Sequence, residues 1–183
     1  LTADERIMLE RTEALIDGIK LLKKILNVNK VLIGIEDNKM GIIDIVRHAA
    51  DIDHDIKVCV TKTRYPQGGE RQLIEALTGR IVPPRPGLPM DVGVVVHNVT
   101  TCVAIYDAIY KGKPLYERVL TVAGGAVANP KNLLVRNGTP IKVIADACGI
   151  MATPAKIVMG GPMMGIAVSG METPVGKSTS GVL

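Results

Sequence analysis

The segment Lys30-Val31-Leu32-Ile33-Gly34-Ile35-Glu36 decides the fold of this chain. Its apolar residues run for the length of one strand, which is typical of a parallel strand buried on both faces. A helix over about residues 3–26 is expected before it, because Thr2 and Glu5 form a capping box and apolar residues then recur at helical spacing. The chain is therefore expected to begin as a helix followed by a buried strand.

Helices and strands continue to alternate after this strand as far as about residue 110. The expected elements are a helix over residues 39–50, a strand over 56–60, a helix over 69–79, a strand over 92–96 and a helix over 101–110. Alternation of this kind favours a mostly parallel sheet with helices on both faces. The expected fold class of this part is α/β and Rossmann-like.

The pattern changes at Lys111-Gly112-Lys113-Pro114, where we expect a domain boundary that separates residues 1–113 from residues 114–183. Beyond it, two apolar runs flank the turn Gly124-Gly125 and predict a hairpin. The expected elements are strands over residues 118–122 and 132–136, a helix that Thr139-Pro140 opens and Gly149 ends, and a strand over 156–159. This order predicts a small β-grasp domain of the α+β class.

The composition argues against several classes of protein. The 183 residues are 47% apolar, which is enough for a buried core. The longest apolar runs fall far short of the roughly 20 residues of a membrane-spanning helix, so no direct membrane insertion is expected. The polar N-terminal segment does not resemble a signal peptide, which indicates a cytoplasmic location. The net charge of +4 is spread along a chain without Phe or Trp, so nucleic-acid binding is not expected.

The three cysteines, Cys59, Cys102 and Cys148, are far apart in the sequence and have apolar neighbours. Cysteines in this pattern are expected to be reduced, unbridged and largely buried. The chain has no Cys-x-x-Cys pair and only three histidines, so a zinc or iron–sulfur site within it is not expected.

Two segments are candidates for ligand binding, because polar residues follow expected strands there. The first is Tyr65-Pro66-Gln67-Gly68-Gly69-Glu70, between a strand and a helix. Its glycines would let the backbone approach a ligand closely, and the amides at the helix N-terminus would favour an anion. The alternative interpretation is a plain strand-to-helix turn with Glu70 in the first helical turn.

The second segment is Val96-His97-Asn98-Val99-Thr100-Thr101, at the end of the next expected strand. Ligands of open α/β sheets bind outside the carboxyl ends of strands, so both segments would line one crevice if their strands are adjacent. The alternative interpretation is that Asn98 or Thr100 only caps the following helix. No carboxylate or nucleophile stands at a defined spacing from His97, so we assign it no catalytic role.

Three longer segments resemble a known family, and the resemblance covers essentially the whole chain. Residues 64–73, 87–99 and 156–165 closely resemble the C subunit of Rnf electron-transport complexes. That protein is similar to the NADH-binding flavoprotein subunit of respiratory complex I, in which FMN accepts a hydride from NADH. The resemblance implies that residues 1–113 are part of an FMN- and NADH-binding domain. It also implies that residues 114–183 form a soluble-ligand-binding β-grasp domain.

The resemblance also implies cofactor-binding residues. The family's Tyr-x-x-Gly-x-Glu loop matches Tyr65, Gly68 and Glu70, and Gly69 stands where the complex I relatives carry a second Glu. The family's Val-Asn-Asn-Val element matches residues 96–99, with His in place of the first Asn. The implied cofactor-binding residues are Tyr65, Gly68, Gly69, Glu70, Val96, His97, Asn98 and Thr101. Residues 82–86 read Val-Pro-Pro-Arg-Pro where those relatives have Lys-Pro-Pro-Phe-Pro, so dinucleotide contacts are not carried over there.

The family's glycine-rich loop, which wraps the flavin phosphate, and its cysteine clusters, which hold two 4Fe-4S centres, are absent from the sequence. Both are expected beyond the two ends of the chain, which we expect to be cut. The implied parent is a peripheral subunit on the cytoplasmic side of the cell membrane. It would bind the nicotinamide dinucleotide and would work with the other subunits of an ion-translocating ferredoxin:NAD oxidoreductase.

The fragment alone is expected to be inactive, and two alternative functions stay open. One is a soluble flavoprotein relative that feeds electrons to a reductase. The other is a non-enzymatic ligand-binding or assembly module, which the replacements at Gly69 and His97 leave open.

Overall fold

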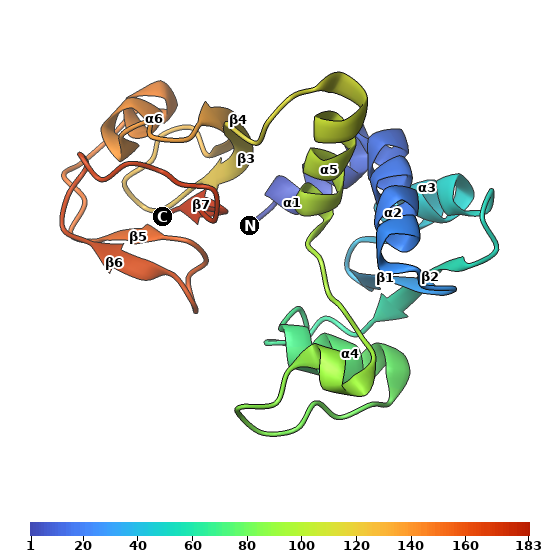
Figure 1. Cartoon of the computed structure of the whole chain (residues 1–183). Coiled ribbons are helices and arrows are strands. Elements are labelled where there is room, and N and C mark those ends of the chain that lie inside the picture. The colour runs from blue at the N-terminus through green and yellow to red at the C-terminus, as the bar shows by residue number, and fades with distance from the viewer. The chain divides into compact units, whose positions relative to one another are not determined.

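The computed structural model describes residues 1–183, which divide into two compact units. The first unit is Met8–Lys111, and the second combines Leu1–Ile7 with Gly112–Leu183 (Figure 1). The change of unit after Lys111 lies within the segment at which the sequence pattern changes. The first seven residues differ from the expectation, because they group with the C-terminal unit instead of with the residues that follow them.

Residues 1–7, which we call the N-terminal strap, are held in the second unit by specific contacts. The backbone N–H groups of Thr2 and Ala3 donate to Oγ1 of Thr121, at 3.0 and 3.1 Å. The hydroxyls of Thr2 and Thr121 both donate to Oδ1 of Asn132, at 3.0 and 2.8 Å. Ala3 and Ile7 are buried. These partners lie more than 100 residues along the chain, and no local pattern in the sequence indicates them.

The helix expected over residues 3–26 is divided into two helices, α1 (Ala3–Glu10) and α2 (Thr12–Leu26). Arg11 between them leaves the helical conformation, with φ −131° and ψ 33°. The break falls beside the point where the chain passes from the second unit to the first. One continuous helix was the wrong prediction, because the helical conformation is interrupted at Arg11, one turn after the chain passes from the second unit to the first at Met8.

The first unit contains two parallel strands, β1 (Val31–Glu36) and β2 (Ile56–Thr61). The helices of this unit, besides α2, are α3 (Met40–Ala50), α4 (Glu70–Thr78) and α5 (Val99–Lys111). Helices α2 and α5 pack so closely that a Cβ atom at Gly18 would lie 2.0 Å from the carbonyl oxygen of Cys102. Parallel strands with flanking helices confirm the predicted α/β class.

The strand expected over residues 92–96 is absent. Pro89–Val92 form a short 3₁₀ helix, η1, and Gly93 follows in the left-handed conformation with φ 68°. The sheet of this unit contains only β1 and β2. Residues 94–98 therefore have no neighbouring strand with which to exchange backbone hydrogen bonds, and an apolar run without such a neighbour does not form a strand. The prediction of a strand was wrong for this reason.

The second unit contains a five-stranded sheet and the helix α6 (Ile141–Cys148). The strands are β3 (Glu117–Val122), β4 (Lys131–Arg136), β5 (Ile157–Met159), β6 (Ile166–Val168) and β7 (Gly181–Val182), in the order β4-β3-β7-β5-β6. β3 and β4 form the predicted antiparallel hairpin, and α6 stops at Gly149 as predicted. The helix begins one residue later than expected, with Pro140 at its N-cap.

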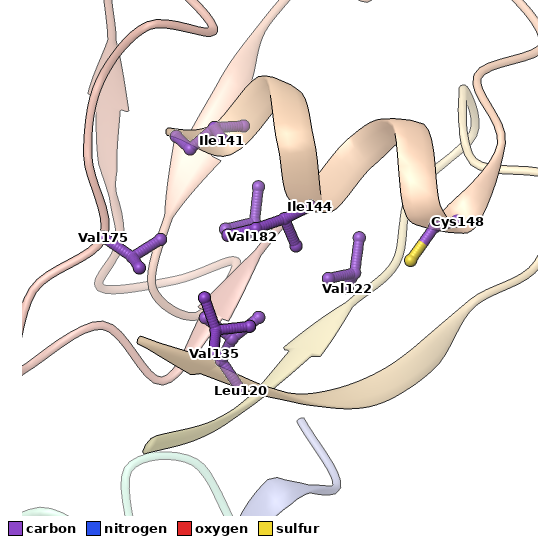
Figure 2. Packing of buried hydrophobic residues seen from close by; sticks show 8 residues of the cluster. All are labelled: Leu120, Val122, Val135, Ile141, Ile144, Cys148, Val175 and Val182. Carbon is purple, nitrogen blue, oxygen red and sulfur yellow. The ribbon is translucent and has the colours of Figure 1, made fainter. Parts of the chain in front are cut away.

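A cluster of aliphatic side chains and one cysteine packs the sheet against α6 (Figure 2). Alternate residues of a strand share one face, and Leu120 and Val122 of β3 are both almost fully buried on the face toward the helix. The cluster consists of Leu120, Val122, Val135, Ile141, Ile144, Cys148, Val175 and Val182. Burial raises the pKa of the Cys148 thiol. This core belongs to the second unit alone.

All three cysteines are free, as predicted, but only Cys102 and Cys148 are buried. Cys59 is half-buried, because β2 has a neighbouring strand on one side only. Burial raises the pKa of Cys102 to about 11. Across the chain, no helix combines the length and apolar character needed to cross a membrane. No group of three His, Cys, Asp or Glu side chains is arranged to hold a metal ion.

Candidate cofactor-binding site

Residues 65–70, which we call loop 65–70, lead from β2 into α4 and are held by their own backbone. The N–H of Gln67 donates to the carbonyl of Arg64, and the N–H of Gly69 donates to the carbonyl of Pro66, both at 2.7 Å. Gly69 is the N-cap of α4, with φ −65° and ψ 139°, and no side chain caps the helix. The loop is therefore the strand-to-helix connection that the sequence predicts at this position.

The first turn of α4 presents backbone donors next to the loop. The first helical hydrogen bond runs from the Leu73 N–H to the Gly69 carbonyl at 2.8 Å, so the N–H groups of Glu70, Arg71 and Gln72 precede it. The helix dipole adds partial positive charge at the same place. A ligand with phosphate or carbonyl oxygens could accept hydrogen bonds from these amides.

The two glycines of loop 65–70 have different surroundings. A Cβ atom on Gly68 would have no protein atom within 4 Å, so the backbone here is open to an approaching ligand. A Cβ atom on Gly69 would lie 2.5 Å from Oε1 of Gln72 and 3.0 Å from the Pro66 carbonyl oxygen. Tyr65 is 60% exposed. Gly68 and Tyr65 are therefore accessible from solvent. At Gly69, in contrast, Gln72 and the Pro66 carbonyl leave no room for a side chain.

Asp37 ties the carboxyl ends of β1 and β2 together just before loop 65–70. Its Oδ1 accepts hydrogen bonds from the backbone N–H and the hydroxyl of Thr63, at 3.0 and 2.7 Å, and Lys62 Nζ lies 3.6 Å from its Oδ2. The Thr63 hydroxyl, and then the Thr63 amide, hold the pKa of Asp37 below its ordinary value. Sequence reasoning missed Asp37, although a carboxylate directly after a parallel strand is a usable signal.

The second candidate segment lies at the start of α5. Asn98 Oδ1 accepts the N–H of Thr100 at 2.8 Å, and the Asn98 carbonyl accepts the N–H of Thr101 at 3.0 Å. Asn98 therefore caps α5, and whether it also contacts a ligand stays a prediction. Val96 is half-buried, whereas His97 and Thr101 are exposed.

The two candidate segments differ in what precedes them. Loop 65–70 follows β2, whereas residues 96–98 follow no strand, because the strand expected over residues 92–96 is absent. The expectation that both segments emerge from neighbouring strand ends is therefore wrong for the second one. That they meet around a single ligand stays a prediction.

Sequence reasoning also missed two arginines at the ends of α4. Arg71 Nη1 donates to the carbonyl of Pro83 at 2.5 Å, and Arg71 Nη2 donates to the carbonyl of Gly87 at 2.7 Å. Arg80, just beyond the other end of the helix, donates to the carbonyl of Val92 at 2.8 Å. All these acceptors are backbone carbonyls, which no side-chain pattern in the sequence marks.

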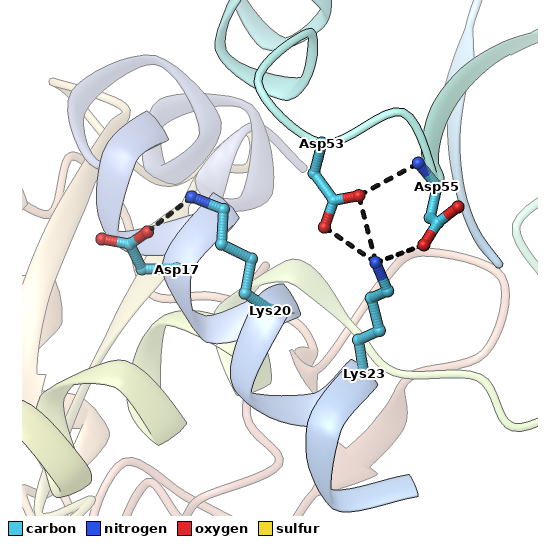
Figure 3. A network of polar contacts seen from close by, with 5 residues as sticks. All are labelled: Asp17, Lys20, Lys23, Asp53 and Asp55. Atoms are coloured by element: carbon cyan, nitrogen blue, oxygen red, sulfur yellow. Dashed lines mark hydrogen bonds and ion pairs between the residues drawn. The ribbon is translucent and has the colours of Figure 1, made fainter. Parts of the chain in front are cut away.

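A polar network fixes the turn that leads into β2 (Figure 3). Lys23 of α2 donates to both carboxylate oxygens of Asp53, at 3.0 and 2.9 Å, and to Oδ2 of Asp55 at 2.6 Å. Hydrogen bonding to Asp55, and then to Asp53, raises the pKa of Lys23, and the hydrogen bond from Lys23 lowers the pKa of Asp53. The network lies at the start of β2, at the opposite end of the strand from loop 65–70, and fixes the strand to α2.

Two known domain families match parts of this chain. The Nuo51 FMN-binding domain matches residues 1–107, which is more than half of the chain, and the SLBB domain matches residues 119–167. The chain belongs to the Nuo51 FMN-binding domain family. Loop 65–70 and residues 96–101 both lie within the part of the chain that matches the Nuo51 family.

This Nuo51-family chain is similar over its full length to the C subunit of ion-translocating complexes. It is 50% identical to the C subunit of the proton-translocating ferredoxin:NAD(+) oxidoreductase complex of Clostridium ljungdahlii. It is 44% identical to the C subunit of the Na(+)-translocating ferredoxin:NAD(+) oxidoreductase complex of Acetobacterium woodii. These comparisons cover 100% of this chain but only 40% and 41% of the two relatives. The predicted resemblance is confirmed, and the chain spans less than half the length of these relatives.

Solved structures of an NAD+-reducing [NiFe]-hydrogenase share the fold of the Nuo51-family chain. The air-oxidized state matches with a TM-score of 0.80 and 18% identity, over 100% of this chain and 38% of that one. The H2-reduced state matches with a TM-score of 0.75 and 19% identity, over the same shares. At such low identity the likeness shows the fold alone.

Proposed function

We propose that this chain is the central part of the C subunit of an ion-translocating ferredoxin:NAD oxidoreductase, in which the unit Met8–Lys111 helps to bind FMN and NADH. The observation that carries the proposal is loop 65–70, which places an open glycine and uncapped helix amides after the carboxyl end of β2. The match to the Nuo51 FMN-binding domain and the names of the relatives support it.

Loop 65–70 fits FMN in two respects. The backbone amides beside it are suitable hydrogen-bond donors, and Gly68 leaves space for a ligand to approach. FMN offers phosphate, hydroxyl and carbonyl oxygens, and the amides of residues 70–72 can donate to such atoms. Gly68 lets the backbone approach a ligand without a side chain in between. The exposed ring of Tyr65 suits contact with an aromatic ligand. In this proposal Tyr65, Gly68, Gly69 and Glu70 form the first group of contacts.

The second group of contacts in the proposal is Val96, His97, Asn98 and Thr101. Asn98 caps α5 and so holds this segment in one conformation. The exposed side chains of His97 and Thr101 lie on either side of it in the sequence, where a ligand could reach them. No catalytic or metal-binding role is assigned to any of these residues.

When bound, FMN supplies the redox chemistry, because its ring system accepts two electrons as a hydride and releases them one at a time. The residues of this chain would bind the polar atoms of the cofactor, orient its ring system and restrict the access of water. The proposal places 4Fe-4S clusters, as acceptors of single electrons, in parts of the parent outside residues 1–183. The isolated chain is proposed to be inactive.

The proposed partners are the other subunits of the complex and the nicotinamide dinucleotide. The relatives named above belong to complexes that translocate protons or sodium ions. Ion translocation requires partners embedded in a membrane. We therefore place the parent as a peripheral subunit at the cytoplasmic side of the cell membrane, held there by those partners.

The test is the change Gly68→Val in the full-length subunit, with FMN binding followed by flavin fluorescence. We expect the dissociation constant of FMN to rise more than tenfold, or by above about 1.4 kcal/mol, because a side chain would stand between the backbone and the flavin. The variant should fold normally, since a Cβ atom at this position meets no protein atom within 4 Å.

The matched control is Gly41→Val, another glycine at which a Cβ atom would meet nothing within 4 Å, located in α3. It should leave the affinity for FMN unchanged. An unchanged affinity for FMN in a folded Gly68→Val variant would show that loop 65–70 is a plain strand-to-helix turn and not part of the flavin site.

A further inference from the structure

The strands β1 and β2 separate just before loop 65–70. The last backbone hydrogen bond between them runs from the N–H of Asp37 to the carbonyl of Thr61, at 2.8 Å. The chain after β1 then turns toward α3, and the Lys39 N–H donates to the Glu36 carbonyl at 3.0 Å. In the register of this parallel pair, the next backbone donor on the β2 side is the N–H of Thr63. This donor therefore comes at the point where the backbone of β1 turns away.

The side chain of Asp37 supplies the acceptor for this donor. Its Oδ1 accepts both the N–H and the hydroxyl of Thr63, at 3.0 and 2.7 Å. Hydrogen bonds to an ionised carboxylate are stronger than those between neutral groups. The same bonds hold the pKa of Asp37 below its ordinary value, so its oxygens only accept hydrogen bonds at neutral pH. The pairing of β1 with β2 is therefore continued by one side chain as far as Thr63.

This contact fixes the point from which loop 65–70 leaves the sheet. Thr63 lies two residues before Tyr65, where the loop begins. The turns inside the loop close through its own backbone, so they fix its shape but do not attach it to β1. At this end, the positions of Tyr65 and Gly68 relative to the sheet therefore depend on the two hydrogen bonds to Asp37.

The other end of loop 65–70 is held independently, by the packing of α4 on β1. A Cβ atom on Gly34 would lie 2.8 Å from Cδ1 of Leu73 and 3.3 Å from Cδ1 of Leu77, so the helix lies close against the strand. This packing does not involve Asp37. Loss of the carboxylate should therefore release the start of the loop and leave α4, with the amides of its first turn, in place.

We propose that Asp37 is a positioning residue, which holds the first half of loop 65–70 where Tyr65 and Gly68 can contact the flavin. The inference rests on the proposed function of loop 65–70. A binding site loses affinity when its contacts move by more than about 0.5 Å, and an exposed turn that has lost its attachment to the sheet moves further than that. In this arrangement Asp37 acts through Thr63 and not by contact with the ligand.

The experiment measures the affinity of the full-length subunit for FMN by flavin fluorescence. For Asp37→Ala we expect the dissociation constant to rise about tenfold, because the start of the loop is no longer held in place. Asp37→Asn should restore the affinity to within about threefold of the wild type, since its amide oxygen can still accept from Thr63. Thr63→Val removes the hydroxyl but keeps the backbone N–H, and its affinity should lie between those of the wild type and Asp37→Ala.

The matched control is Asp53→Ala, at the opposite end of β2. Asp53 also accepts a backbone N–H, that of Asp55 at 3.0 Å, and it binds Lys23 of α2. Its loss should lower the Tm but leave the affinity for FMN unchanged. Thermal unfolding of every variant should be recorded beside the binding, so that an effect on the loop is separated from an effect on stability.

Several results would overturn the inference and leave the proposed function standing. One is an unchanged affinity for FMN in a folded Asp37→Ala variant. Another is an Asp37→Asn variant as weak as Asp37→Ala, because the charge and not the acceptor for Thr63 would then matter. A loss of affinity in Asp53→Ala as large as in Asp37→Ala would show a general effect of stability.

Two further outcomes complete the test. If Asp37→Ala does not fold, Thr63→Val decides, and an unchanged affinity for FMN in that variant overturns the inference. A wild-type subunit that binds no FMN would instead overturn the proposed function.

Discussion

The close approach of α2 and α5 at Gly18 predicts the effect of adding a single methyl group. The perturbation is Gly18→Ala. Its Cβ atom would lie 2.0 Å from the carbonyl oxygen and 2.7 Å from the carbonyl carbon of Cys102. Both of these are backbone atoms of a helix, which cannot rotate out of the way as a flexible side chain can. The two helices would have to separate, and the neighbouring buried residues Leu15 and Ile19 of α2 would lose contacts.

The expected change in the free energy of unfolding is the sum of two opposing effects. Alanine favours a helix over glycine by up to about 1 kcal/mol, because glycine loses more conformational freedom on folding. Overpacking of a well-packed contact costs about 1–3 kcal/mol, and a clash with backbone belongs at the upper end of that range. The variant should therefore be less stable by about 2 kcal/mol. For a chain of this size, that corresponds to a fall in Tm of about 4–8 °C.

The assay is thermal unfolding of the 183-residue chain, followed by far-ultraviolet circular dichroism, to which the helices of Met8–Lys111 contribute most. The control is Gly41→Ala in α3, where a Cβ atom meets nothing within 4 Å, so only the helix-propensity term applies. This control should be as stable as the wild type or slightly more stable. A Gly18→Ala variant as stable as Gly41→Ala would refute the close packing of the two helices.

Two further predictions concern titratable groups of the first unit. Asp107 is buried beside Arg11 and Lys111, at 2.7 and 3.2 Å, and Asp107→Asn should lower stability by about 1–2 kcal/mol at neutral pH. Burial raises the pKa of Asp107, but the hydrogen bonds from Arg11 and Lys111 outweigh it and hold the pKa below its ordinary value of 3.8. The contribution is therefore complete above that value and is lost as the pH falls through the lower pKa of the folded state, so urea unfolding should show wild type and variant converging in acid. For the cysteines, a thiol reagent at about pH 8 should label Cys59 at least tenfold faster than Cys102, because burial raises the pKa of Cys102 to about 11 and excludes the reagent. Equal labelling rates would contradict the burial of Cys102.

Much of the local structure was predictable because its causes are local. The turn Gly124-Gly125 lies between two apolar runs, and these runs form the β3–β4 hairpin. The end of α6 at Gly149 follows from the positive φ of 75° at this residue, which glycine adopts more readily than other residues. That Asn98 caps α5 was predictable because an Asn before a helix can cap it regardless of the rest of the fold.

The features that sequence reasoning missed depend on partners distant in the chain. Residues 92–96 have the composition of a strand, but composition cannot show whether a neighbouring strand is present. The acceptors of Arg71 are backbone carbonyls up to 16 residues away. Every residue has a backbone carbonyl, so the sequence does not indicate which ones accept these hydrogen bonds. The connection from β2 to α4 was therefore predictable, because one loop follows one strand there, whereas the contacts of Arg71 with residues 82–87 were not.

The N-terminal strap has a consequence for the order in which the chain folds. Residues 8–111 are, in topological terms, an insertion within the second unit. Thr2 and Thr121 are 119 residues apart, and closing a flexible loop of that length costs about 4 kcal/mol of chain entropy. On the ribosome, Thr121 is made on the order of ten seconds after Thr2. The inserted unit is continuous in sequence and can fold during that interval, so the N-terminal strap should find its place after that unit, although it is synthesised before it.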